Sequence, residues 1–93
     1  MSPKRLGAGL GPEHIAGLIA IYAAGNGSIK ARVPEPAIRK KLHKPYRELC
    51  SEILKDLKKH PDGLVYVRRG KSLSYGITMN GIKFLQQKGI PLR

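Results

Sequence analysis

The 93-residue sequence is short of acidic residues, with six Asp and Glu against eighteen Lys and Arg, for a formal charge of +12. This shortage excludes charge balance within the chain, because a compact protein with such an excess repels itself. Proteins of this kind usually bind polyanions, so nucleic acid is the first expectation and an anionic membrane surface the second. A hydrophobic content of 41% argues against a disordered basic tail. We therefore expect a folded module with a basic surface.

Cysteine is also scarce. The single Cys50 excludes an internal disulfide and fits a reducing compartment, so we expect a cytoplasmic or nucleoid-associated protein. Its apolar neighbours favour a buried structural thiol over a reactive nucleophile. The histidines, at 14, 43 and 60, lack companions at metal-ligand spacing, and we find no carboxylate pair, Ser-His-Asp order or P-loop. The sequence predicts no enzyme activity, metal site or cofactor.

No apolar run reaches the roughly 20 residues that a membrane-spanning helix needs. The segment IAGLIAIYAA, Ile15–Ala24, follows two cations and superficially resembles the apolar core of a signal peptide. The intervening Pro12-Glu13 is instead typical of a helix start, because both residues favour the first helical turn. We expect a first core helix over residues 12–24 and no membrane association.

Glycine and proline divide the chain into an arm and one domain. Residues 1–11 hold three glycines, a proline and two cations, which predicts a flexible basic arm before a domain over 12–93. Alternating apolar and polar residues predict a short strand over 28–33. Pro34-Glu35-Pro36 then begins a short helix in which Ile38 and Leu42 point inward and three cations point outward, namely Arg39, Lys40 and Lys41.

A third helix is expected over residues 45–60, with three sectors on its surface. The apolar arc is Tyr46, Leu49, Cys50, Ile53, Leu54 and Leu57, the basic stripe is Arg47, Ser51, Lys55 and Lys58, and the acidic stripe is Glu48, Glu52 and Asp56. Strands over 64–68 and 73–77 flank a charged tip, and Thr78 is a good N-cap for a last helix over 78–88. In the first helix, the face expected to be buried is Ile15, Leu18, Ile19 and Tyr22.

The stretch ILKDLKKHPDGLVYVRRGKSLSYGITMNGIKFL resembles the recognition helix, wing and closing helix of winged helix-turn-helix proteins. Those families show an apolar helix with a charged end, Gly-Leu-Val, a basic hairpin and Tyr-x-(Leu/Ile)-Thr-x-x-Gly. The resemblance covers about residues 12–89. Within this family, the chain is most similar in type to small basic proteins of archaea and their viruses. It implies an α+β fold in the order helix, strand, helix, helix, strand, wing, strand, helix. Two departures are a turn at 42–45 without glycine and three acids on the recognition helix.

The resemblance implies that helix 45–60 lies in the DNA major groove and the wing at 68–72 on the backbone or minor groove. Arg and Lys at the wing suit phosphate or a narrow minor groove, and Gly70 allows a tight tip. Arg47 and Ser51 are expected at base edges, with Lys44 and Lys55 on flanking phosphates. The full candidate set is Arg39, Lys40, Lys44, Tyr46, Arg47, Ser51, Lys55, Arg68, Arg69 and Lys71, of which Tyr46 also suits core packing.

Plainer interpretations stand beside these. A basic turn can be a solvated hairpin end, and Glu52 can balance Lys55 on the helix surface. The charge of +12 favours binding, since solubility requires far less. A duplex-DNA-binding transcriptional regulator is the main expectation, a winged-helix RNA-binding or ribosome-associated protein the alternative, and an interaction module the third. A homodimer through helices 12–24 and 78–88 is also expected, because Ile21 and Phe84 fall off the main apolar faces.

Overall fold

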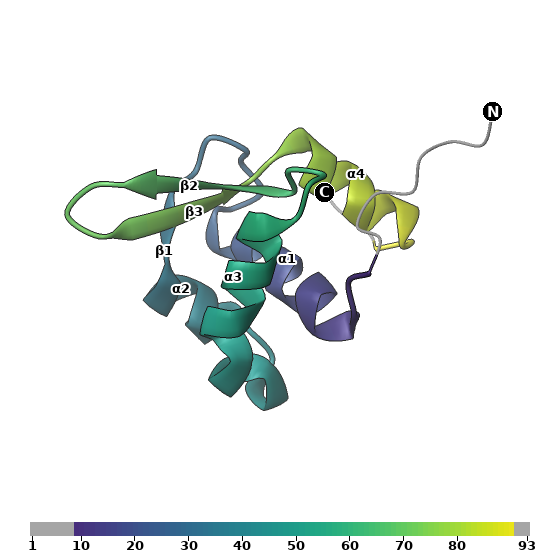
Figure 1. Cartoon of the computed structure of the whole chain (residues 1–93), viewed down its shortest axis with the longest axis horizontal. Helices are drawn as coiled ribbons and strands as arrows, with labels where there is room; N and C mark the ends of the chain where they lie inside the picture. The colour runs from purple at the N-terminus through teal and green to yellow at the C-terminus, as the bar shows by residue number, and fades with distance from the viewer. Residues whose placement is uncertain (1–8, 91–93) are drawn as a thin grey trace.

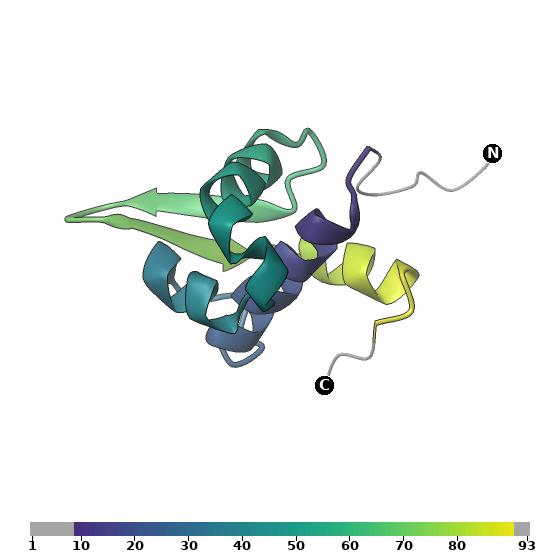
Figure 2. The same cartoon turned by 90° about the horizontal axis from the view of Figure 1, so that it is seen from below.

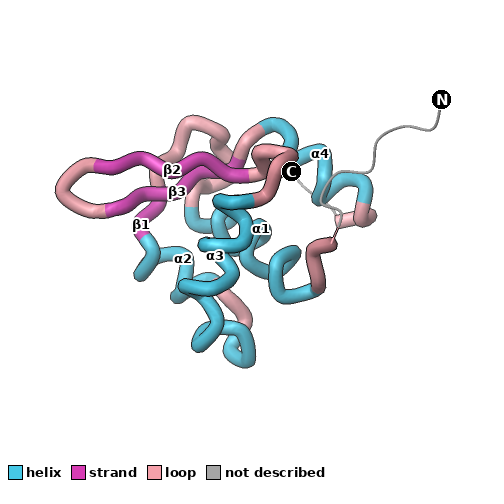
Figure 3. Tube along the Cα trace, viewed as in Figure 1, coloured by secondary structure: helices cyan, strands magenta, loops and turns pink. Residues whose placement is uncertain are grey.

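The computed structural model describes residues 9–90 as an α+β arrangement of four α-helices, one 3₁₀-helix and a three-stranded antiparallel sheet (Figure 1 and Figure 3). In chain order these are α1 (Pro12–Ala24), β1 (Val33–Pro34), α2 (Glu35–Lys41), η1 (Lys44–Leu49), α3 (Cys50–Lys59), β2 (Val65–Arg69), β3 (Leu73–Ile77) and α4 (Met79–Gln87). The predicted α+β class is confirmed, as is the order of its helices and strands. Most of the predicted flexible arm, residues 1–8, lies outside the described residues.

The sheet has the strand order β1-β3-β2, and β2 and β3 form a hairpin that projects beyond the helices (Figure 1). Val65 lies opposite Ile77 and Val67 opposite Tyr75, and these four side chains share the face of the sheet that packs on the core. Tyr66 lies opposite Gly76 and Arg68 opposite Ser74 on the other face, because successive side chains in a strand alternate. The predicted hairpin is confirmed, with its first strand one residue later than expected.

The buried face of α1 differs from the predicted one. Ile21 is only 1% exposed, whereas Ile19 is 38% exposed. The reason is Gly17, which brings α1 so close to α3 that a Cβ atom there would lie 2.5 Å from Ile53 Cγ2. This close approach turns the face of α1 that contains Gly17, Leu18 and Ile21 toward the core. A helical wheel assigns the buried face from the large apolar side chains, so it does not register a glycine that allows close helix packing.

The last helix begins as predicted, since the N–H of Gly81 donates to Thr78 Oγ1 at 3.1 Å. Phe84, however, is fully buried at 0% exposure and belongs to the same core cluster as Ile21. Both residues on which the expected homodimer depended are therefore internal to one chain. The large apolar side chain that α4 leaves exposed is Met79.

The strand predicted over residues 28–33 is wrong for most of its length, because only Val33 and Pro34 pair with β3. The hydroxyl of Tyr66 lies 3.0 Å from the carbonyl oxygens of both Ile29 and Ala31. The Lys30 N–H donates to Ser28 Oγ at 3.1 Å. Side chains thus satisfy backbone groups that a longer strand would have paired with a neighbour.

The predicted third helix is divided into η1 and α3. A 3₁₀-helix advances by about 120° per residue instead of the 100° of an α-helix, so side chains of η1 lie off the wheel drawn for one continuous helix. Leu49, predicted in the apolar arc, is 41% exposed. Cys50, Ile53, Leu54 and Leu57 are buried as predicted, and so are Ile38 and Leu42 at α2.

The contact between Gly17 and Ile53 gives a direct test of this packing. We expect Gly17→Ala to lower the free energy of unfolding by about 1–3 kcal/mol, because the added methyl group overpacks the interface between α1 and α3. Gly70→Ala is the matched control, since a Cβ atom there meets nothing within 4 Å. Urea denaturation of both variants measures the difference. Equal stability of Gly17→Ala and the original protein would contradict the close approach.

Candidate nucleic-acid interface

The orientation of α3 is set by a contact near its middle with the start of α1. His14 is buried, and its Nδ1 accepts a hydrogen bond from the N–H of Gly11 at 3.0 Å. Because Nδ1 is the acceptor, Nε2 carries the hydrogen that is donated to Asp56 Oδ2, also at 3.0 Å. This bond ties one flank of α3 to α1. The pair lies 42 residues apart in sequence, so no local motif indicated it.

The opposite flank of α3 carries the basic side chains. Cys50, Ile53 and Leu57 point into the core, which leaves Ser51, Lys55 and Lys58 exposed on the side away from Asp56. Ser51 and Lys55 are thus brought together as predicted. Glu52 is also exposed and lies between this basic flank and Asp56. The acidic stripe is not a uniform solvent face, because His14 holds its last member.

Arg47 has a different position from the one predicted. Its Nε donates to the carbonyl oxygen of Leu42 at 3.1 Å, and its Nη2 donates to that of Lys40 at 3.4 Å. These carbonyls belong to the C-terminal end of α2, where a helix has unpaired acceptors and a partial negative charge. The guanidinium therefore fastens η1 to α2, although the Arg47 side chain as a whole remains exposed.

The remaining candidates near α2 and η1 are divided between exposed and engaged positions. Lys40 and Lys44 are exposed. Arg39 forms an ion pair with Glu35 one turn earlier in α2, with an N–O distance of 3.5 Å. Tyr46 is half-buried and packs against the core, which supports the packing interpretation of this residue.

The cations of the hairpin are exposed, but they do not share one surface. Arg69 follows Val65 and Val67 on the face of the sheet that meets α3, whereas Arg68 follows Tyr66 on the opposite face. Lys71 lies in the tip between the strands, where the N–H of Gly70 donates to the carbonyl of Ser72 at 3.3 Å. The wing candidates therefore separate into Arg69 on the face of the sheet that meets α3, Arg68 on the opposite face and Lys71 in the projecting tip.

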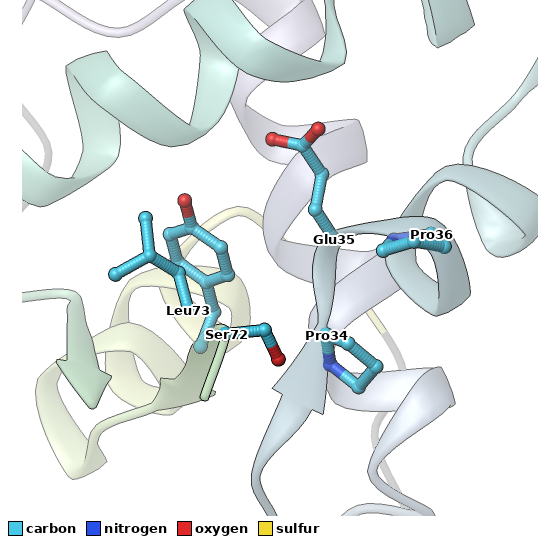
Figure 4. A pocket seen from close by; sticks show the side chains of 6 residues that line it. Pro34, Glu35, Pro36, Ser72 and Leu73 are labelled. Atoms are coloured by element: carbon cyan, nitrogen blue, oxygen red, sulfur yellow. The ribbon is translucent and has the colours of Figure 1, made fainter. Parts of the chain in front are cut away.

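A shallow hollow of about 330 Å³ lies between the start of α2 and the outer end of β3 (Figure 4). It is mostly apolar, and its lining residues are Pro34, Glu35, Pro36, Ser72, Leu73 and Tyr75. Its carboxylate is already paired with Arg39, and burial raises the pKa of the Tyr75 hydroxyl. This hollow presents neither a free cation for an anionic ligand nor a nucleophile beside a base.

The lone cysteine is structural, as predicted. Cys50 is fully buried, and burial raises the pKa of its thiol, an effect that a hydrogen bond with Arg39 partly offsets. Among residues 9–90, no group of three or more His, Cys, Asp or Glu side chains is placed to hold a metal ion. None of the helices in this range has the length and apolar character to cross a bilayer.

Across residues 9–90, only Arg39 among the lysines and arginines forms an ion pair with a carboxylate. The exposed cations of α3, η1 and the hairpin thus carry uncompensated charge on the surface. Such a surface attracts polyanions over a range set by the Debye length, about 8 Å at physiological ionic strength. Comparison with protein-family models, curated proteins and solved structures found no match to this chain.

The contacts of Arg47 predict a structural role that can be measured. We expect Arg47→Ala to lower the free energy of unfolding by about 0.5–1.5 kcal/mol, because two hydrogen bonds to the end of α2 are lost. Lys44→Ala removes the same charge from an exposed neighbour and is expected to leave stability nearly unchanged. Thermal unfolding of the two variants compares them. A loss shared equally by both would point to charge and not to the hydrogen bonds.

Proposed function

We propose that the protein is a winged helix-turn-helix protein that binds duplex DNA and regulates transcription in the cytoplasm or nucleoid. In this assignment α2 and the η1–α3 segment form the helix-turn-helix, and the β2–β3 hairpin is the wing. The element order and the antiparallel sheet are compatible with it. The function is carried by one observation, which is that α3 and Arg69 of the hairpin expose cations on the same side of the sheet, where none of them forms an ion pair with a carboxylate of residues 9–90.

The roles of the side chains follow from their positions. Ser51 and Lys55, exposed on α3, are the candidates for base edges, since lysine binds guanine O6 and N7 and serine binds several bases. In this proposal the exposed Lys58 and Lys44 contact phosphates beside them. Glu52 is compatible with this surface if it accepts a hydrogen bond from cytosine N4, a pairing that carboxylates make in the major groove.

The hairpin contributes affinity in this proposal and little sequence preference. Arg69 and Lys71 project beyond the core at the far end of a stiff two-stranded element. Cations at such a position reach phosphates or the narrow minor groove beside the major groove that α3 occupies. Arg47 acts indirectly, because its bonds to α2 set the position of η1 and thereby the start of α3.

Binding to duplex DNA is expected to depend strongly on salt. If about six phosphates are neutralised, log K falls against log salt concentration with a slope near −5. Fluorescence anisotropy with a labelled duplex at several potassium chloride concentrations measures the slope. A response that stays flat at moderate salt would remove the electrostatic basis of the proposal.

The helix and the wing are expected to fail differently when they are changed. Lys55→Ala should cost about 1–3 kcal/mol on a preferred site, selected from random duplexes, and much less on scrambled DNA. Arg69→Ala with Lys71→Ala should weaken binding to both duplexes alike and flatten the salt slope by about two units. Titrations against both duplexes at two salt concentrations distinguish these results.

Lys83→Ala on α4 is the control for the loss of one exposed charge away from this surface. Equal weakening of both duplexes by Lys55→Ala would show that α3 does not read sequence. The same duplexes made as RNA test the alternative function. Equal or tighter binding to RNA, together with comigration with ribosomes in cell extracts, would replace the DNA assignment.

A further inference from the structure

A second basic surface lies on the face of the hairpin that bears Tyr66 and Arg68. Lys30 and Arg32 of the loop at 25–32, together with Arg68 of β2, line an open hollow of about 460 Å³. The other lining residues are Ile29 and Tyr66, and none of the six acidic residues of the chain is among them. Lys30 and Arg32 were outside the set of binding residues expected from the sequence.

The loop is held against β2 before any ligand arrives. The Tyr66 hydroxyl is within 3.0 Å of the Ile29 and Ala31 carbonyls on either side of Lys30. The ring lies over Gly76, where any Cβ atom would collide with it, so the sheet fixes the ring in turn. Because the cations stand on an ordered frame, a ligand that binds them avoids much of the entropy cost of ordering the loop.

The charge of this hollow indicates the chemistry of its ligand. Three cations that face one space without an acidic partner repel one another, which opposes folding. An anion placed between them removes that repulsion, and phosphate accepts hydrogen bonds from both guanidinium and ammonium groups. A phosphodiester backbone supplies several such anions at a regular spacing. The hollow therefore favours phosphate of a nucleic acid over a neutral or cationic ligand.

The hollow and α3 lie on opposite sides of the hairpin. In Figure 1 the loop at 25–32 passes above and behind the hairpin while α3 lies below it, and Figure 2 shows the same separation from another direction. Duplex DNA has a persistence length of roughly 150 base pairs, so bending a duplex seated on α3 around the hairpin to reach this loop costs several kcal/mol. A duplex that lies straight on α3 therefore passes on one side of the hairpin, and a phosphate backbone in the hollow is most simply supplied by another segment of nucleic acid.

We infer that the hollow formed by Lys30, Arg32 and Arg68 binds the phosphate backbone of a second duplex, so that one protein molecule bridges two DNA segments. This inference rests on the proposed function, because the first duplex is held at α3 and the wing tip. Tyr66 is a positioning residue here, since it holds the loop that carries two of the three cations.

A two-duplex capture assay tests the inference. A duplex with the preferred site is fixed to beads, protein is added, and retention of a second, fluorescent duplex is measured after washing. We expect the original protein to retain the second duplex, and Lys30→Ala with Arg32→Ala to reduce its retention about tenfold or more through the loss of two phosphate contacts. Binding of the first duplex by this double variant, measured by anisotropy, should change by less than about twofold, since both residues lie on the far side of the hairpin.

Two further variants separate charge from position. Lys83→Ala with Lys88→Ala removes the same charge from α4 and its C-cap and should leave capture unchanged. Tyr66→Phe keeps every charge but frees the Ile29 and Ala31 carbonyls, so capture should fall while binding of the first duplex remains. Thermal unfolding confirms that each variant is folded.

The outcomes distinguish the two proposals. If the protein binds no duplex at all, the proposed function and the inference both fail. If the first duplex binds but the second is not retained, only the inference fails. Retention that persists in the Lys30→Ala, Arg32→Ala variant, with two protein copies per complex by sedimentation, would assign bridging to a dimer and overturn the role of the hollow.

Discussion

The close approach of α1 and α3 is the constraint on which the rest of the molecule depends. Gly17 allows Ile53 to occupy the space that a side chain on α1 would otherwise fill. The hydrogen bond from His14 to Asp56 holds the same two helices together at the rim of the core. With both contacts in place α3 cannot rotate about its axis. These contacts therefore determine which side chains of α3 face solvent. The candidate nucleic-acid interface is thus a consequence of packing on the buried side of the helix.

Four of the six acidic side chains lie against a histidine or an arginine of the fold. Glu35 pairs with Arg39, Glu13 and Asp56 both contact His14, and Asp62 Oδ2 lies 3.7 Å from His60 Nδ1 in the turn before β2. Acids used in this way order helices and turns but do not neutralise the cations of the surface. This division explains how a small domain keeps a high positive charge outside while contacts of its few acidic side chains help to hold its helices and turns together.

Tyr66 has a comparable organising role in the sheet. Its ring needs the absence of a side chain at Gly76, and its hydroxyl holds a loop that has no strand partner of its own. These contacts hold the loop at 25–32 on the face of the hairpin opposite α3. The cations near the hairpin therefore lie on its two faces. Arg69 lies with α3, and Arg68 lies with Lys30 and Arg32. The chain therefore exposes positive charge on both sides of the hairpin.

The sequence alone determined the α+β class, the bounds of the first helix, the hairpin, the N-cap Thr78 and the buried positions of α2 and α3. These features depend on local periodicity, turn residues and capping, which act over a few neighbouring residues. The tertiary structure decided the burial of Ile21 and Phe84, the exposure of Leu49, the engagement of Arg47 with α2, and the hollow beside Tyr66. Each of these follows from contacts with other elements or from a change in helical pitch. A helical wheel or a strand pattern describes one regular element at a time, so it predicts neither the contacts between elements nor a change of pitch within a helix.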